Sequence, residues 1–247
     1  MSARGLRPGG RGLGSGSGPQ DHAGMLWKLV LVLLGCSALV LVLSEQNARG
    51  PVSPSVQLPP DGISLESTRL VDRGVAHYRG HGVPQDYKEA VRLYRMAAEL
   101  GDHHAMTNLG TCYSLGKGVD IDLGESVRWY RLAVERGNVM AMEKLAGCYH
   151  LGLGVERNTA EAVRLVSKAA NLGSVGAMVD LGWYYADGEG VPMDHVMAYA
   201  WFNLAAAEGS EDAKERRARL EVKMTPQQIS EGQSVARDLH SRLGEVR

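Results

Sequence analysis

The chain has little of several features that would point to a function. Only 6% of its 247 residues are aromatic, and there are three cysteines. Three cysteines are too few, and too odd in number, for the disulfide framework of a small secreted scaffold. The formal net charge is -1, so no excess of one sign favours nucleic acid or an acidic substrate as the partner.

Glycine, in contrast, is plentiful at 31 residues. Eight glycines fall in the first 24 residues, together with Arg4, Arg7 and Arg11. This segment has too few apolar side chains to bury a core, so residues 1–24 are predicted to be a disordered tail. Fifteen further glycines recur at a fixed period, which indicates an internal repeat.

Residues 25–43 are almost all apolar, with Lys28 near the start. A helix of this length spans about 28 Å, which is just enough to cross a bilayer. We therefore predict a transmembrane signal-anchor helix and, through it, contact with a membrane. Basic residues before the span place the amino terminus in the cytoplasm and the bulk of the protein outside it, in a bacterial periplasm.

Other interpretations of this segment stay open. A cleaved signal peptide is one, because Val42-Leu43-Ser44 has a small residue at a possible cleavage site. The Leu-Leu-Gly that precedes Cys36 also resembles a lipoprotein processing box, which would lipidate that cysteine. Met25 would make a compact export signal if it were the true start, and the arginines of the tail leave mitochondrial placement open. Residues 44–66 contain four prolines and are predicted to be an extended linker.

A repeat of 36 residues covers the rest of the chain. Gly80, Gly82, Ala97 and Gly101 each recur at intervals of 36 without any insertion. A period of this length marks a solenoid, in which each unit stacks on its neighbours. The predicted repeats are 67–102, 103–138, 139–174 and 175–213, and a C-terminal helical cap follows at 214–247.

Within each unit, apolar residues at helical spacing predict two helices separated by a Gly-x-Gly turn. One column of the first helices holds small residues, because a side chain there would keep the two helices apart: Gly74, Gly110, Ala146 and Gly182. One column of the second helices holds larger residues, which we expect to fill the space between units: Tyr94, Tyr130, Val166 and Phe202. In the cap, Thr225, Pro226 and Gln228 predict a helix that starts with a capping box.

The pattern Ala-Met-x-x-Leu-Gly-x-x-Tyr-x-x-Gly-x-Gly-Val-x-x-Asp, followed by a helix that ends Ala-Ala-x-x-Gly, resembles the Sel1-like repeat, a relative of the tetratricopeptide repeat. The resemblance covers residues 67 to about 213. It implies an all-α fold, a right-handed α/α solenoid of four helical hairpins. It also implies that the first helices line a concave groove.

Nothing in the sequence requires catalysis, a cofactor or a metal site. Cys112 and Cys148 occupy one column in adjacent repeats, where packed helices are too far apart for a disulfide, so two free thiols are predicted. His77, His81, His103 and His104 lack the further ligands of a metal site. Glutamate and arginine recur at i, i+3 on the second helices and predict a ladder of weak ion pairs: Glu89 with Arg92, Glu125 with Arg128, and Glu161 with Arg164.

We therefore predict a membrane-anchored adaptor, not an enzyme, that binds an unknown protein or peptide and no nucleic acid. The resemblance places these residues in the partner-binding groove: Val75, Thr107, Thr111, Ser114, Glu143, His150, Val179 and Trp183. Trp183 is either a binding anchor or a core plug for the last repeat. The alternative function is a ligand-binding protein or hydrolase of the cell wall.

Overall fold

The computed structural model describes residues 64–246, and this part of the chain is helical throughout, with no strand. Its helices are α2 (Leu65–Arg79), α3 (Tyr87–Glu99), α4 (His103–Leu115), α5 (Leu123–Glu135), α6 (Val139–Leu151), α7 (Thr159–Asn171), α8 (Val175–Asp187), α9 (His195–Ala207), α10 (Glu211–Glu221) and α11 (Pro226–Val246). Within residues 64–246, no helix has both the length and the apolar character needed to cross a membrane. The predicted tail, membrane span and most of the linker lie outside the described residues.

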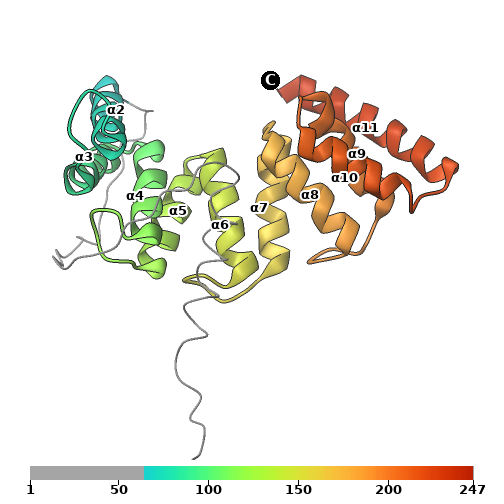
Figure 1. Cartoon of the computed structure of the whole chain (residues 1–247), viewed down its shortest axis with the longest axis horizontal. Coiled ribbons are helices and arrows are strands. Elements are labelled where there is room, and N and C mark those ends of the chain that lie inside the picture. The colour runs from blue at the N-terminus through green and yellow to red at the C-terminus, as the bar shows by residue number, and fades with distance from the viewer. Residues whose placement is uncertain (1–63, 247) are drawn as a thin grey trace, which may run out of the picture. The chain divides into compact units, whose positions relative to one another are not determined.

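The helices pair into hairpins that follow one another along the chain. The hairpins are α2 with α3, α4 with α5, α6 with α7, and α8 with α9, and each second helix also packs on the first helix of the next hairpin (Figure 1). Sequence neighbours are therefore spatial neighbours, as the repeat predicts. The all-α solenoid of four helical hairpins is confirmed.

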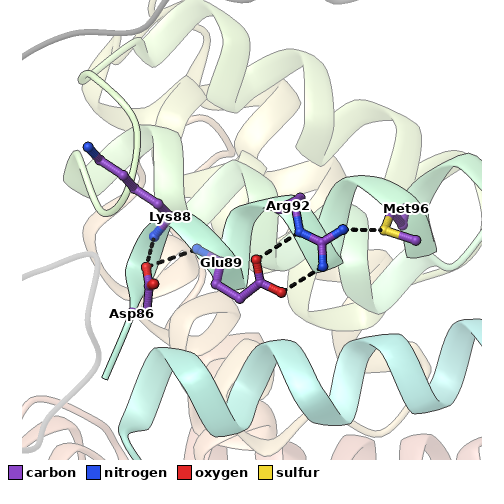
Figure 2. A network of polar contacts seen from close by, with 5 residues as sticks. All are labelled: Asp86, Lys88, Glu89, Arg92 and Met96. Atoms are coloured by element: carbon purple, nitrogen blue, oxygen red, sulfur yellow. Dashed lines mark hydrogen bonds and ion pairs between the residues drawn. The ribbon is translucent and has the colours of Figure 1, made fainter. Parts of the chain in front are cut away.

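Short polar residues start the helices and so define the repeat. The Asp86 carboxylate accepts hydrogen bonds from the backbone N–H groups of Lys88 and Glu89, at 2.9 and 3.0 Å (Figure 2). One turn later, Arg92 donates two hydrogen bonds of 2.7 Å to the Glu89 carboxylate. Equivalent ion pairs join Glu125 to Arg128 and Glu161 to Arg164, so the predicted ladder is confirmed.

Small residues on the first helices let the two helices of a hairpin approach closely. A Cβ on Gly110 would lie 2.5 Å from the ring of Tyr130, and Gly182 has a similar contact with Phe202 at 2.6 Å. These rings therefore pack against the glycine of their own hairpin. Tyr130 also belongs to a core cluster with Met142 and Leu145 of the next repeat, and the expectation that the column fills the space between units stays a prediction. In the third repeat the corresponding positions hold Ala146 and the smaller Val166, both buried, so the sizes at the two positions vary together along the repeats.

The second glycine of each turn is where one repeat touches the one before it. Gly118 has φ +75°, and a Cβ there would lie 2.2 Å from the carbonyl oxygen of Tyr87, the first residue of α3. Gly154 meets the carbonyl oxygen of Leu123 in the same way, at 2.1 Å. Only glycine allows both the left-handed backbone and this close approach. Gly82, in the first repeat, has no such neighbour among the described residues.

The last two helices close the stack. Ser210 caps α10, which begins at Glu211, and α11 packs on α9. The Thr225 N–H donates to the Gln228 side chain at 2.9 Å and the Gln228 N–H donates to the Thr225 hydroxyl at 3.3 Å, so the predicted capping box is confirmed. Ala236 is buried in the core that extends through the third and fourth repeats, and α11 thereby covers apolar surface at this end.

Candidate functional site

One face of the first helices carries most of the polar variation between repeats. We call it the first-helix face and define it by the register of Thr68, Val71, Asp72 and Val75 in α2, repeated every 36 residues. In α4 the register holds His104, Thr107, Asn108 and Thr111; in α6 it holds Met140, Glu143, Lys144 and Gly147; and in α8 it holds Gly176, Val179, Asp180 and Trp183. Some of its positions are buried, among them Thr107 and Val179, whereas others such as Asp72 and His104 are exposed.

A pocket of about 400 Å³ lies on this face and is shared by the first three repeats. Its lining residues come from the first helices and their N-caps: Thr68, Val71, Asp72, Asp102, His104, Thr107, Asn108, Asn138 and Met140. Met140 has 57% of its surface exposed. The pocket therefore combines polar groups with accessible apolar surface.

The pocket contains two N-cap residues that are fixed by hydrogen bonds. Asp102, only 1% exposed, accepts from the backbone N–H groups of His104 and Ala105 at 2.8 and 3.0 Å. Asn138, 3% exposed, caps α6 by accepting from the Ala141 N–H at 2.8 Å. Because both are committed to helix ends, they give the pocket a rigid wall.

Asn138 also determines the state of a histidine at the start of α4, the preceding first helix. Its Oδ1 atom is held by Ala141, so its amide nitrogen must face His103, whose Nδ1 atom lies 2.8 Å away. Nδ1 must therefore accept, which makes His103 neutral with its proton on Nε2. Burial lowers the pKa of His103, and the neighbouring His104 lowers it further, in agreement with a neutral ring.

Three of the predicted groove residues lie along α4, and their hydroxyls bind their own helix. Thr107 donates to the His103 carbonyl at 2.8 Å, Thr111 to the Thr107 carbonyl at 3.0 Å and Ser114 to the Thr111 carbonyl at 2.9 Å. Thr107 is only 2% exposed. Of the predicted set, Thr107 is the one that lines the pocket, although it offers little surface there.

Trp183 has features of both roles considered for it, a binding anchor and a core plug. Trp183 is half-buried and packs against the core. Its ring stands edge-on to His150 and Tyr184, with centroid distances of 5.5 and 5.0 Å. The structure thus brings His150 and Trp183 together, whereas Val75 is half-buried in α2 and Val179 is 9% exposed.

Charged residues gather on the first-helix face at α6 and α8, and on α10, which follows α8 and α9. Glu143 accepts a short hydrogen bond from the hydroxyl of Ser174, the N-cap of α8. Asp180 keeps exposed surface, yet the protein around it removes part of its hydration and Glu143 repels its charge, which together raise its pKa to about 6. Arg216 opposes that shift. Burial lowers the pKa of Lys144 in the same region.

Among the described residues, the cysteines and histidines form no metal-binding cluster and no reactive thiol pair. Cys112 and Cys148 are buried free thiols, which confirms that prediction. Burial raises their pKa to about 12 and about 11 respectively, so both stay protonated near neutral pH. Within residues 64–246 no group of three His, Cys, Asp or Glu side chains is placed to hold a metal ion.

Sequence reasoning missed two polar residues of the pocket, the exposed Asp72 and the half-buried Asn108. Both belong to a column that continues with Lys144, Asp180 and Arg216. Every member of that column is polar, and its residue type changes in nearly every repeat. A column that varies in this way while its neighbours repeat was the available signal for a surface not used in stacking.

Comparisons with known proteins agree with this architecture. A family model described as Sel1 repeat matches residues 72–102, 103–138, 139–174 and 175–210. A search of curated proteins found no significant match.

Two solved structures are similar to the chain. One is c5321, a protective antigen present in uropathogenic Escherichia coli strains and displaying an SLR fold, with 33% identity and a TM-score of 0.63 over 72% of this chain and 38% of that one. The other is a Sel1 repeat protein from Oxalobacter formigenes, with 31% identity and a TM-score of 0.58 over 62% of this chain and 63% of that one. The chain thus spans less than two thirds of either structure.

Proposed function

Because the chain belongs to the Sel1 repeat family, we propose that it is an adaptor whose first-helix face binds a segment of a partner protein. Sel1 repeats are in general protein–protein interaction modules, and the family is typically a non-catalytic scaffold. We assign the chain no catalytic step.

One observation carries the choice of face. The pocket of about 400 Å³ is built from three successive first helices, and Met140 in its wall is 57% exposed. A segment lying across α2, α4 and α6 would cover apolar surface and meet several polar side chains at once. The second helices α3, α5 and α7 carry the ion-pair ladder instead, and their glutamate and arginine charges are already matched within each helix. They therefore leave fewer unpaired charges for a partner.

A pair of arginine substitutions tests the proposal. Asn108→Arg should fill the pocket with a long side chain. The helix should tolerate the change, because the equivalent positions further along the chain already hold Lys144 and Arg216. The matched control is Ser167→Arg on α7, a register that holds Arg95 and Arg131 in the earlier repeats. Each variant adds one positive charge.

The assay is crosslinking in intact cells, followed by purification and mass spectrometry. A partner captured by the native protein and by Ser167→Arg, but not by Asn108→Arg, is the expected result. Equal capture by all three forms would contradict binding at the first-helix face. The double variant Trp183→Ala, Thr111→Arg tests in the same way whether the face extends along α4 to α8.

We further propose that residues 25–43 anchor the chain in a membrane, with the repeats outside the cytoplasm of a bacterial cell. This proposal rests on the apolar sequence between Met25 and Leu43 and on the basic residues that precede it. Alkaline carbonate extraction and protease protection of spheroplasts test it. Retention in the membrane and cleavage from the outer side are expected; release by carbonate would contradict the anchor.

A further inference from the structure

The pocket has a chemistry of its own, and this inference rests on the proposed function. We propose that the pocket on α2, α4 and α6 receives a basic side chain, lysine or arginine, of the partner segment. Its cation donates hydrogen bonds to the Asp72 carboxylate and the Asn108 carbonyl oxygen, and its aliphatic stem lies on Val71 and Met140.

The polar groups of the pocket divide into committed and available ones. Asp102 and Asn138 cap helices, and the hydroxyls of Thr68 and Thr107 donate to carbonyls of their own turns. Asp72 and Asn108, by contrast, make no side-chain hydrogen bond or ion pair to any residue in the described part of the chain. These two side chains occupy the same register in adjacent repeats and are available to a ligand.

The sign of the charge favours a cation. Two carboxylates, Asp72 and Asp102, line the pocket, and no lysine or arginine is among its lining residues. His104 is the one basic side chain there. The Asp102 carboxylate is engaged by the backbone N–H groups at the start of α4, whereas Asp72 has no partner in the described part of the chain. An acidic or phosphorylated segment would meet the negative charge of Asp72, whereas a lysine or arginine would complement it.

The apolar part of the wall fits the same side chains. Val71 is half-buried beside Asp72 on α2, and Met140 is 57% exposed on α6. Lysine and arginine carry a flexible aliphatic stem that covers apolar surface while the charged end reaches a polar group. A pocket with an apolar rim and a free carboxylate therefore suits one basic side chain better than it suits a purely apolar anchor.

The test uses the purified full-length chain, immobilised in detergent, and a phage library of random peptides of about 12 residues, long enough to cross two or three repeats. Peptides are selected on the native protein, on Asp72→Asn and on Asp180→Asn. Asp180 is the matched control because it occupies the register of Asp72 in the fourth repeat. Asp72 is exposed, so its substitution should leave the fold intact.

Lysine or arginine should be enriched at one peptide position on the native protein and on Asp180→Asn, and the enrichment should disappear on Asp72→Asn. A synthetic peptide from the native selection should then lose about tenfold in affinity when its basic residue is replaced by neutral citrulline or norleucine, the change typical of one charge-assisted hydrogen bond. On Asp72→Asn the two peptides should bind equally.

The possible failures are distinguishable. Selected peptides that Asn108→Arg blocks, but that show no basic enrichment, would overturn this inference and leave the proposed function standing. Basic enrichment that depends on Asp180 and not on Asp72 would also overturn it, because the cation would then bind in the fourth repeat. Peptides that bind native protein and Asn108→Arg equally would contradict the proposed function itself.

Discussion

Alanine substitution of the second turn glycine separates two contributions to stability, because the repeat places that glycine in two environments. Gly82 and Gly118 have nearly the same φ, +74° and +75°. Among the described residues a Cβ at Gly82 meets nothing within 4 Å, whereas a Cβ at Gly118 lies 2.2 Å from the Tyr87 carbonyl oxygen and 2.9 Å from the Lys88 nitrogen. Gly82→Ala is therefore a built-in control for Gly118→Ala.

The magnitudes follow from the geometry. A left-handed conformation costs a residue with a Cβ about 1–2 kcal/mol, so Gly82→Ala should lower the free energy of unfolding by about 1 kcal/mol. Gly118→Ala adds a clash with backbone atoms that cannot rotate away, and forced overpacking costs a further 1–3 kcal/mol as a rough range. The total at Gly118 should therefore be about 3 kcal/mol.

Urea unfolding followed by far-ultraviolet circular dichroism measures the difference between the variants. Gly154→Ala should resemble Gly118→Ala, because its Cβ would lie 2.1 Å from the Leu123 carbonyl oxygen. Equal losses for Gly82→Ala and Gly118→Ala would refute the reasoning, since the contact between repeats would then contribute nothing to the requirement for glycine.

Three further predictions concern packing and pH. Val166→Tyr should destabilise the third hairpin by about 1–3 kcal/mol through overpacking. Adding Ala146→Gly should recover most of that loss, as urea unfolding would measure. If the effects of the two substitutions on the free energy of unfolding simply add, the pairing of sizes is contradicted. Asp180→Asn should raise the free energy of unfolding by about 1 kcal/mol at pH 7.5, discounted for exposure. The Asp180 pKa is raised to about 6, so ionisation of this carboxyl weakens the fold as the pH rises through 6. The stability gained by Asp180→Asn should therefore shrink at pH 5. A gain that does not depend on pH would argue against repulsion between Glu143 and Asp180. His103 has a lowered pKa, so its contribution is present above the unfolded value of about 6.5 and is lost as pH falls through the folded value. His103→Gln should therefore lose less stability between pH 7.5 and pH 5 than the native protein, as thermal unfolding would measure, and an equal loss would contradict the neutral ring.

The repeat architecture was predictable because it depends on short-range rules. The glycines that end the helices and the residues that cap them recur in every 36-residue repeat, so each can be recognised from nearby residues alone. The capping box of Thr225 and Gln228 is an example, because it spans only four residues. The close packing at Gly110 was predictable for the same reason, since a column of small residues needs a steric cause. The contact between the Tyr130 ring and Gly110 itself was not, because it depends on which glycine and which ring meet across the hairpin.

The site was predicted only in part because a column in the sequence does not tell how much of a side chain is exposed. Thr107 belongs to the expected face, yet its hydroxyl turns back to the His103 carbonyl and its surface is covered. Asp72 and Asn108 lie one residue further along each helix and remain accessible. The bond between Asn138 and His103 joins residues 35 apart, and only the stacking of the first helices brings the starts of α4 and α6 together.

Site-specific photocrosslinking tests the central claim, binding at the first-helix face, most directly. A benzophenone amino acid is introduced at Asn108 in the pocket or at Ser167 on α7, and intact cells are irradiated. A partner adduct is expected from position 108 and none from position 167. Excess of a peptide selected on the native protein, supplied to permeabilised cells, should abolish the adduct from position 108. Adducts from position 167 with none from position 108 would contradict that claim.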